Sequence, residues 1–333
     1  MTKARAALFH EVGDSEVLRL EQVDVPEPGP GEIRLRISAF GLNRSEAMFR
    51  QGWHPVKPQL PSRIGYEAAG IVESVGQGVT EFAVGDHVGT LPIMELNPYG
   101  AWGELMIVPV HWATLTPPGL DALESASLWS SYMTAYAGLV DLVSIKVGNY
   151  VLVTAASSSV GPPAIQILKM LGARVIATTR GRTKGEAIRA MGADHVIVTD
   201  EEDLVRRVNE ITGNAGVQFV FDPIGGPAIE QLTKITAPYG TIILYGVLSF
   251  DPAPLPLGDV VSKNLNLLGF AMMLEDRPER NARAIQFIRD GVKTGKLRPL
   301  IAKSFTLDEV VNASRYLDSM QQIGKVVVQV DHA

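Results

Sequence analysis

The sequence contains no cysteine, and this absence excludes several kinds of chemistry at once. Disulfide bonds, thiolate nucleophiles and zinc sites with cysteine ligands all require that residue. The chain also lacks any run of about 18 apolar residues, so no segment is expected to span a membrane. The residues that follow Met1 do not include an apolar stretch of the kind found in signal peptides, so none is expected. These features predict a protein of the reducing cytoplasm.

The chain also lacks an excess of basic residues, and its formal net charge is −6 over 333 residues. It therefore has no general attraction to nucleic acid or to an anionic membrane surface. Six histidines are present, and no two have the close helical spacing of paired zinc ligands. We expect no resident metal, no nucleic-acid partner and no membrane partner.

The remaining composition is that of a globular enzyme, with 46% apolar and 20% charged residues. The length predicts about two domains. Up to about Pro118, strand-like runs such as GEIRLRISAFGLN and AAGIVESVGQGV are separated by glycine and proline, which predicts a twisted, mostly antiparallel β-domain. ALESASLWSSYMTAYAGLV then has the apolar spacing of a helix.

From Tyr150 onward the chain alternates between strand-like and helix-like segments. The expected strands are YVLVTA, ARVIATT, HVIVTD, VQFVFDP, GTIILYG and NLNLLGF, and the helices between the first five are IQILKMLG, KGEAIRAMG, EEDLVRRVNEITG and IEQLTKITAPYG. This alternation predicts an α/β fold with a doubly wound parallel sheet. A helix, ERNARAIQFIRDGVKTG, follows, and we expect the final strands IAKSFTL and KVVVQV to return to the first domain.

The turn VLVTAASSSVGPP, after the first of these strands, has the outline of a dinucleotide-binding loop with few of its glycines. In the pattern G-x-G-x-x-G, Ala156 and Ser158 take the first two glycine positions and Gly161 the third. Small side chains still permit close backbone approach, and Ser158, Ser159 and Val160 keep N–H groups where a pyrophosphate binds. The turn predicts a nucleotide site, and a purely structural turn is the alternative.

Thr179 marks the position, 18 residues past Gly161, where an acidic residue is expected to bind the ribose 2′-hydroxyl of NAD. Arg180, Arg182 and Lys184 follow it. A hydroxyl beside a basic cluster suits a 2′-phosphate. The sequence therefore predicts NADPH as the cofactor, and the alternative is a solvated basic loop.

These segments, in this order, resemble the medium-chain dehydrogenase/reductase family over nearly the whole chain. The match rests on GEIRLRISAFGLNRSEAMFRQG, RIGYEAAGIVESVGQGVTEFAVGDHV, MTAYAGL, the AASSSVG loop, FDPIGG, LYG and IGKVVV. The branch that looks most similar is the zinc-independent quinone oxidoreductase and enone reductase group. The resemblance implies a GroES-like catalytic domain over residues 1–123 and 271–333, and a Rossmann NADPH-binding domain over residues 124–270.

The family's zinc-dependent members carry cysteine or histidine ligands at three positions, which match Asn43, Tyr66 and Ser130 here. None of these residue types is a good zinc ligand. Another group must then polarise or protonate the substrate. The resemblance places Tyr66 next to the reacting atoms, where its phenol could donate to a developing enolate. The alternative is that Tyr66 only fills the vacated space.

Two further catalytic candidates come from the resemblance. Ser45 matches a proton-relay hydroxyl, although a serine in a turn is also commonplace. Asn43 matches an asparagine that contacts the nicotinamide end of the cofactor. Met48 stands where quinone reductases carry a tyrosine, and this departure from their pattern argues against quinone reduction.

The resemblance also implies cofactor contacts outside the loop. Arg44 and Lys325 match cationic positions near the pyrophosphate, and Asp222 lies after the fourth strand, near the switch point where ligands bind. The contacts expected around the nicotinamide are Thr134, Val160, Tyr245, Gly246, Phe270 and Met272.

Together these features predict a NADPH-dependent reductase that transfers hydride to an activated alkene, a quinone or a carbonyl compound. The pocket candidates favour an apolar substrate and are Met48, Trp129, Phe270, Met272 and Met273. The alternatives are a ketone/alcohol oxidoreductase and a non-catalytic NADPH-binding sensor or structural protein. NLNLLGF is expected at an apolar sheet edge, which predicts a homodimer.

Overall fold

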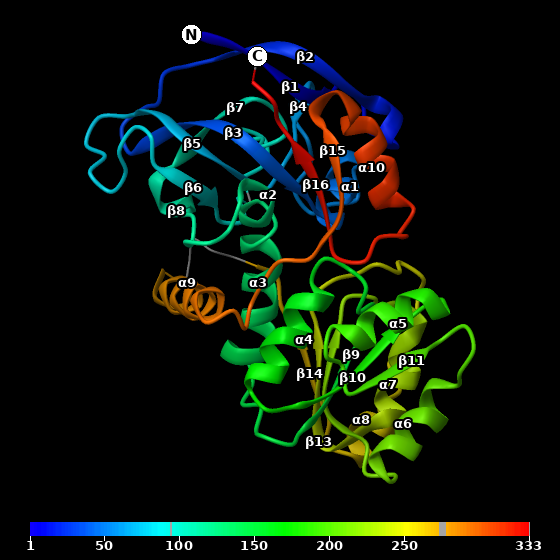
Figure 1. The fold of residues 1–333 in the computed structure, drawn as a ribbon. Coiled ribbons are helices and arrows are strands. Elements are labelled where there is room, and N and C mark those ends of the chain that lie inside the picture. Colours follow the sequence, from blue (N-terminus) through cyan, green and yellow to red (C-terminus); the bar gives the residue numbers. More distant parts are fainter. Residues whose placement is uncertain (94, 273–277, 333) are drawn as a thin grey trace. The chain divides into compact units, whose positions relative to one another are not determined.

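The computed structural model describes residues 1–93, 95–272 and 278–332. These residues form two compact units, Met1–Ser131 with Arg298–Ala333 and Tyr132–Leu297. Both ends of the chain belong to the first unit (Figure 1). The unit boundaries therefore lie at 131/132 and 297/298, whereas the sequence predicts 123/124 and 270/271.

Local packing explains both differences. Trp129 lies over Gly89 of the first unit, where a Cβ would come within 2.7 Å of the indole Nε1. Helix α9 (Pro278–Lys293) contacts the second unit, where Arg283 pairs with Asp141 at 3.2 Å. The residues just after 123 therefore belong to the first unit, and α9 belongs to the second.

The first unit is built on a seven-stranded sheet in the order β15-β16-β3-β5-β6-β8, with β7 paired to β3. β15 and β16 run parallel, and the other described pairs are antiparallel. Alternate apolar residues of β3 are fully buried, as a strand with one covered face requires. The strands are β3 (Glu32–Leu42), β5 (Glu67–Val75), β6 (His87–Thr90), β7 (Leu105–Pro109), β8 (Ala113–Leu115), β15 (Ile301–Thr306) and β16 (Lys325–Gln329).

A smaller sheet completes this unit, in the order β2-β1-β4. Its strands are β1 (Thr2–Phe9), β2 (Leu18–Val25) and β4 (Ser62–Arg63), and the accompanying helices are α1 (Arg44–Arg50), α2 (Ala122–Ser125) and α10 (Val310–Asp318). Because β16 pairs with β3, the predicted return of the last strands to the first domain is confirmed.

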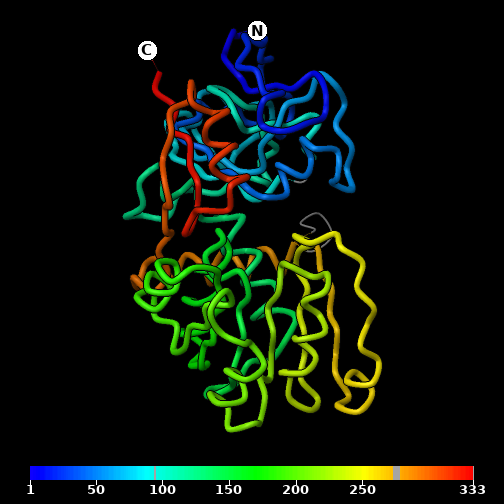
Figure 2. Tube along the Cα trace, turned by 90° about the vertical axis from the view of Figure 1, so that its right-hand side faces the viewer, coloured from blue at the N-terminus to red at the C-terminus, as the bar shows by residue number. Residues whose placement is uncertain are grey.

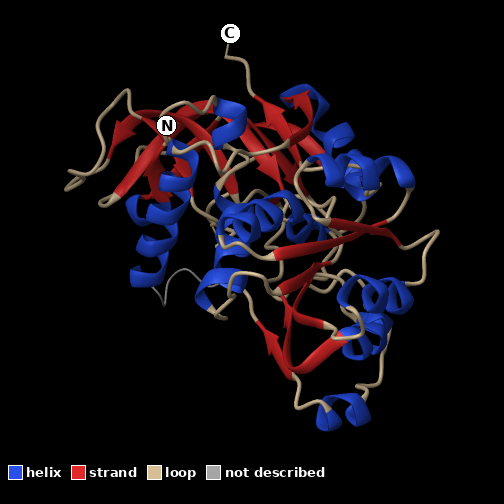
Figure 3. Cartoon of the chain, turned by 60° about the horizontal axis from the view of Figure 1, so that its bottom comes forward, coloured by secondary structure: helices blue, strands red, loops and turns tan. Residues whose placement is uncertain are grey.

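The second unit contains a six-stranded sheet in the order β11-β10-β9-β12-β13-β14, and its described pairs are all parallel. This order confirms the predicted doubly wound sheet with flanking helices (Figure 3). The strand order reverses at β9, so ligands are expected beyond the carboxyl ends of β9 and its neighbours. The strands are β9 (Tyr150–Val153), β10 (Arg174–Thr179), β11 (His195–Val198), β12 (Val217–Asp222), β13 (Thr236–Leu244) and β14 (Asn266–Gly269).

The helices of the second unit follow the predicted alternation, which Figure 2 traces from green to yellow. They are α4 (Gly161–Met170), α5 (Arg182–Ala190), α6 (Leu204–Thr212), α7 (Ile229–Ile235) and α8 (Leu257–Ser262), followed by α9. The helix predicted to continue to Gly240 ends at Ile235, because β13 already begins at Thr236. The long helix predicted from Ala122 to Val140 is broken into α2, α3 (Trp129–Tyr136) and a π-helical turn, Ala137–Asp141.

The core of the second unit lies between the sheet and its helices. Val208 of α6 and Leu232 of α7 are buried in one cluster with Leu152, Ile176 and Ile242 of the strands. Burying each such side chain contributes roughly 1.5–3 kcal/mol. No helix within the described ranges has the length and apolarity needed to cross a membrane.

Candidate functional site

The turn between β9 and α4 contains the predicted nucleotide loop. Ala155 adopts a left-handed backbone conformation, with φ 46°, and the Ser158 N–H donates to the Ala155 carbonyl at 2.9 Å. The Ser158 N–H is therefore used inside the loop, contrary to the sequence prediction. The N–H groups of Ser159 and Val160 have no acceptor among the described residues. Both can bind an anion at the N-terminus of the ten-residue helix α4.

Gly161 is the position where the loop and the helix approach most closely. A Cβ there would lie 2.0 Å from the Ala156 carbonyl oxygen, so a larger residue would collide with the backbone. Ala156 is fully buried at the position of the first motif glycine. The retained third glycine therefore serves strand–helix packing, as in dinucleotide-binding folds.

Two buried hydroxyl groups of this region face each other. Tyr245 Oη interacts with the Ser158 hydroxyl, and neither group has a further hydrogen-bond partner among the described residues. The Tyr245 ring stacks on Phe221 with centroids 4.0 Å apart. Burial, assisted by the charge of Asp222, raises the pKa of the Tyr245 phenol, so the phenol keeps its proton. Buried hydroxyls whose only partner is each other keep hydrogen-bonding capacity for a polar ligand such as a dinucleotide.

Asp222, at the end of β12, is fully buried and braces the loop. Its carboxylate accepts hydrogen bonds from the Thr154 hydroxyl and from the N–H groups of Ile224, at 3.1 Å, and Gly225, at 2.7 Å. Burial raises the pKa of the Asp222 carboxyl, while these three donors oppose the rise. Asp222 thus joins the start of the loop to the turn after β12, and its direct contact with cofactor stays a prediction.

The end of β10 carries the residues predicted to select the 2′-phosphate. Thr179 is buried, and Arg182 pairs with Glu201 at 2.9 Å. Burial and the charge of Arg180 lower the pKa of Lys184. Arg180 and Lys184 therefore lie close to each other, and two neighbouring cations suit a multiply charged anion.

The remaining second-unit candidates lie on several elements. Thr134 is in α3, Val160 precedes α4, Tyr245 and Gly246 follow β13, and Phe270 and Met272 follow β14. Their contacts with a nicotinamide ring stay predictions. Met273, a predicted pocket residue, lies outside the described residues. Trp129, another pocket candidate, is fully buried against Gly89 and is therefore not an open pocket wall.

A buried hydrogen-bonded cluster lies in the first unit. Lys325, the first residue of β16, forms an ion pair with Glu67, the first residue of β5, and the two side chains are 2% and 1% exposed. The Lys325 ammonium also donates to Asn43 Oδ1 at 2.7 Å. Asn43 Nδ2 donates to Glu67 at 3.2 Å. Ser130 donates its N–H to Glu67 at 2.9 Å and its hydroxyl to Asn43 at 3.2 Å.

The structure gives carboxylate partners to both cations expected at the pyrophosphate. Lys325 is paired with Glu67 in the interior. Arg44 pairs at 3.0 Å with Asp318, which also accepts from the buried Arg50 at 2.8 Å. A buried, paired ammonium is not accessible to a phosphate, which argues against the expected role of Lys325. Arg44 remains partly exposed, so its pyrophosphate contact stays a prediction.

Glu46 of α1 connects two of the positions that match zinc ligands. Its carboxylate accepts the backbone N–H of Asn43, at 2.6 Å, and that of Tyr66. Ser130, at the third position, reaches Asn43 through its hydroxyl. Burial raises the pKa of Glu46 to about 8. The structure thus brings Asn43, Tyr66 and Ser130 into one hydrogen-bonded region.

Tyr66 and His54 form a second buried pair, with Tyr66 Oη 3.0 Å from His54 Nε2. Burial raises the pKa of the Tyr66 phenol, although the Ser45 hydroxyl acts in the opposite direction. Burial lowers the pKa of His54. At neutral pH the pair therefore consists of a protonated phenol and an uncharged imidazole, with the catalytic candidate Ser45 close to the phenol.

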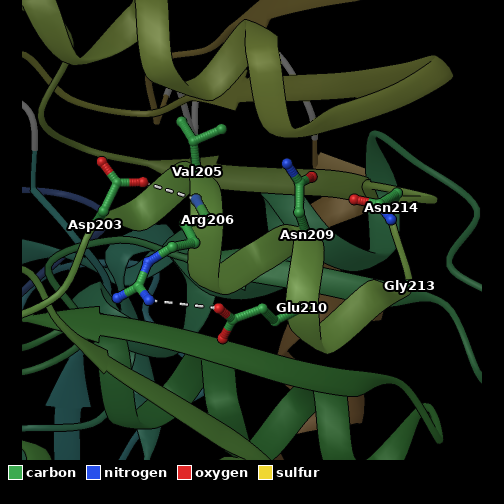
Figure 4. Close-up of a pocket in the computed structure, with 7 residues that line it drawn as sticks. All are labelled: Asp203, Val205, Arg206, Asn209, Glu210, Gly213 and Asn214. Atoms are coloured by element: carbon green, nitrogen blue, oxygen red, sulfur yellow. Dashed lines mark hydrogen bonds and ion pairs between the residues drawn. The ribbon is translucent and has the colours of Figure 1, made fainter.

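Among the described residues, neither metal-binding geometry nor the hollow along α6 adds a competing site. Within the described part of the chain, no group of three histidine, cysteine, aspartate or glutamate residues could hold a metal ion. A hollow along α6 is lined by Asp203, Val205, Arg206, Asn209, Glu210, Gly213 and Asn214 (Figure 4). Asp203 accepts the Arg206 N–H at 2.7 Å and Arg206 pairs with Glu210 at 3.6 Å, so these groups serve the helix itself.

Sequence reasoning missed Glu67, Glu46 and Asp318, and it gave His54 no role. For Glu67 and Glu46, the neighbouring sequence offered a signal that could have identified them. Glu67 directly follows Tyr66, and Glu46 stands three residues after Asn43, which is the spacing of a capping box. Asp318 had no such signal, because its partners are far away in the sequence.

Two family models match the chain, each within one structural unit. The alcohol dehydrogenase GroES-like domain matches residues 29–118, and the zinc-binding dehydrogenase model matches residues 159–290. The first match lies in the first unit and includes Glu67 but not Lys325, and the second covers most of the parallel sheet.

Similar proteins extend over almost the whole chain. The 2-haloacrylate reductase of a Burkholderia species is 33% identical over 97% of this chain and 98% of the relative. The quinone oxidoreductase of Pseudomonas aeruginosa is 31% identical over 98% of this chain and 99% of the relative. The crystal structure of an NAD-dependent alcohol dehydrogenase has a TM-score of 0.92 and 32% identity, covering 98% of this chain and all of that chain.

The buried cluster predicts a large loss of stability for Lys325→Met. The substitution leaves the Glu67 carboxylate buried without its cation, which should lower the free energy of unfolding by roughly 3–5 kcal/mol in urea titrations. Adding Glu67→Gln removes the unpaired charge and should restore part of the loss. Lys234→Met, which breaks an exposed pair with Glu230, is the matched control and should change stability little. Equal effects of the two lysine substitutions would contradict the importance of the buried pair.

Proposed function

The chain belongs to the medium-chain dehydrogenase/reductase family, in its quinone oxidoreductase-like branch, and on this premise we propose a NADPH-dependent reductase of activated alkenes. The family relationship makes it an oxidoreductase. The observation that carries the proposal is the β9–α4 loop. Its Ser159 and Val160 N–H groups are open at a helix N-terminus, beside the buried hydroxyls of Ser158 and Tyr245.

A bound nicotinamide cofactor supplies a hydride. In the proposed reaction the β-carbon of an alkene conjugated with a carbonyl group accepts the hydride, and the carbon–carbon π bond breaks. The electron pair moves onto the carbonyl oxygen, which becomes an enolate. A proton then adds to the α-carbon, and the products are the saturated carbonyl compound and the oxidised cofactor. The name 2-haloacrylate reductase, that of a relative, is consistent with alkene reduction.

Tyr66 is the proposed hydrogen-bond donor to the enolate oxygen or the proton source. Its phenol is buried and keeps its proton, because burial raises its pKa. A donor held in a site from which water is excluded stabilises developing charge more than the same donor in water. Ser45 is the alternative proton source. Asn43 would act through the cluster that contains Glu46 and Glu67.

NADPH is the proposed cofactor, on the strength of Thr179 and the neighbouring Arg180 and Lys184. The supporting observations are the burial of Thr179 at the end of β10 and the nearness of Arg180 to Lys184, whose pKa is lowered by burial and by the charge of Arg180. The similar alcohol dehydrogenase structure is described as NAD-dependent, which makes NADH the alternative.

We also infer that the reaction uses no zinc. The support is the chemistry of Asn43, Tyr66 and Ser130 at the positions that match the family's ligands, since an amide, a phenol and a hydroxyl are poor substitutes for thiolate and imidazole. A ketone/alcohol oxidoreductase is the second candidate function, favoured by the similarity to an alcohol dehydrogenase. The cytoplasmic location inferred from cysteine content stays a prediction.

A homodimer is proposed through β14, which lies at the edge of the parallel sheet. An edge strand has unpaired backbone groups that can continue the sheet into a second copy. The chain just before β14 exposes several large apolar side chains, which a partner would cover: Val247, Phe250, Leu255, Leu257 and Val261.

Tyr66→Phe tests the proposed role of the phenol. Loss of a general acid costs about 10²–10⁴-fold in rate, so kcat with a saturating enone should fall on that order while NADPH affinity is unchanged. Tyr99→Phe, which removes a hydroxyl bonded to Glu32 elsewhere in the unit, should leave kcat unchanged. A kcat for Tyr66→Phe within about threefold of the wild type would make Tyr66 a space-filling residue.

The basic cluster predicts at least about tenfold tighter binding of NADPH than of NADH, since a charge-assisted contact contributes about 1.5–3 kcal/mol. Thr179→Asp with Arg180→Ala should narrow or reverse this ratio in fluorescence titrations of both cofactors. Arg189→Ala, at the far end of α5, is the control. Equal binding of the two cofactors by the wild type would leave the cluster as a solvated loop.

Elemental analysis tests the absence of a catalytic metal. Protein purified without a histidine tag should contain far less than one zinc per chain and should keep its reductase activity after dialysis against a chelator. Stoichiometric zinc that is lost together with activity would overturn the inference.

Sedimentation equilibrium tests the dimer. The expected mass is twice the chain mass of 35.9 kDa at micromolar concentration. Val261→Lys, in the exposed apolar segment before β14, should shift the equilibrium toward the monomer, because it would bury a charge at the interface. A wild-type chain that sediments as a monomer would rule out the proposal.

A further inference from the structure

We propose that His54 is a positioning residue for Tyr66: its Nε2–H donates to the Tyr66 oxygen and so directs the phenol's own hydrogen to another acceptor. This inference rests on the role proposed above for Tyr66. It adds the group that sets the direction of the phenolic proton, which neither the sequence patterns nor the similar proteins identify.

The backbone decides which ring nitrogen of His54 carries the hydrogen. The Val56 N–H donates to His54 Nδ1 at 3.1 Å, and a backbone N–H can only donate. Nδ1 therefore presents its lone pair, and the single hydrogen of the neutral ring is at Nε2. Because Nε2 lies 3.0 Å from Tyr66 Oη, Oη is the acceptor of this hydrogen bond. The Tyr66 O–H cannot donate to the same nitrogen.

The local sequence holds the ring in this orientation. Pro55 has no N–H, so Val56 supplies the first N–H after His54. The His54 N–H donates to the Met48 carbonyl at 3.1 Å. The ring is buried and lies edge-on to Phe49, with centroids 6.1 Å apart. Backbone and packing therefore both resist a rotation of the imidazole.

The surrounding charges keep both partners neutral. Burial lowers the pKa of His54, and the positive charge of Lys57 acts in the same direction. Protonation of the ring would also place an N–H on Nδ1 opposite the Val56 N–H, so that two donors would face each other. Burial raises the pKa of Tyr66. Each partner therefore keeps the hydrogen that the assignment requires.

A hydroxyl neighbour alone would not fix the direction of the Tyr66 proton. Ser45 interacts with the phenol, but a serine hydroxyl can donate or accept. The imidazole N–H can only donate, so it occupies a lone pair of Oη and leaves the phenolic hydrogen for Ser45 or for a substrate oxygen. His54 acts through Tyr66 and has no separate contact with the reacting atoms in this proposal.

The tautomer can be measured without any activity assay. Long-range proton–nitrogen NMR spectra of the full chain, labelled in its histidine rings, distinguish a protonated ring nitrogen from an unprotonated one. His54→Gln assigns the His54 signal among the six histidines. The expected result is a neutral His54 at pH 7 with its hydrogen at Nε2. A hydrogen at Nδ1, or a charged ring, would overturn the proposal.

Kinetics then test whether this hydrogen bond matters for the reaction. His54→Phe keeps a planar ring and removes both nitrogens, and kcat should fall about tenfold, the effect of one hydrogen bond. NADPH affinity and substrate KM should stay near wild type. In the Tyr66→Phe background the same substitution should change kcat by less than about twofold, because His54 acts only through the phenol. His54→Gln retains an N–H donor and should recover part of the rate.

The outcomes separate this inference from the proposed function. An equal loss from His54→Phe with and without the Tyr66 hydroxyl would show that His54 only supports packing. A near-wild-type kcat for Tyr66→Phe would reject the catalytic role of Tyr66, and the positioning role with it. If His54→Phe does not fold, the comparison uses His54→Gln, and a rate loss in that variant that equals the loss in Tyr66→Phe would also contradict the proposal. His111→Phe, at an exposed histidine of the same unit, is the control.

Discussion

The buried ion pair between Lys325 and Glu67 is the constraint on which the first unit depends. It joins the start of β16 to the start of β5, across a separation of 258 positions in the sequence. Removing both charges from water is costly, and the cost is offset only where further hydrogen bonds complete the pair. Asn43 and Ser130 supply those bonds. The closing strand of the chain is thereby fixed to the region that contains the catalytic candidates.

This arrangement also explains a glycine on β3. A Cβ at Gly41 would come within 2.4 Å of the Ala126 carbonyl oxygen and 2.6 Å of Lys325 Cε. No side chain fits between the strand and the lysine. Gly41 therefore allows the ammonium to reach Glu67, and a single strand residue controls whether the cluster can form.

Hydrogen bonds connect Asn43, Tyr66 and Ser130, the three positions that the sequence resemblance matches to zinc ligands. Glu46 binds the backbone at Asn43 and Tyr66, and Ser130 reaches Asn43. The order of this region comes from the buried carboxyl groups of Glu46 and Glu67, each of which accepts several donors. Such a network is sensitive to the loss of any member, because each buried polar group then lacks a partner. In the second unit, the predicted nucleotide loop has the small residues Ala156 and Ser158 in place of two motif glycines.

The sequence by itself determined the elements and their order. Strand and helix periods are local, so the six strands of the parallel sheet, the loop that ends at Gly161 and the basic segment after Thr179 could all be predicted. The tertiary structure decided the partners. The sequence placed Lys325 near the pyrophosphate, whereas the structure pairs it with Glu67. The helix predicted to continue to Gly240 ends at Ile235, where β13 begins. The direction of the proton on His54 depends on Val56 and Tyr66 together. Local periodicity does not encode such pairings, because burial and distance between remote residues arise only when the chain has folded.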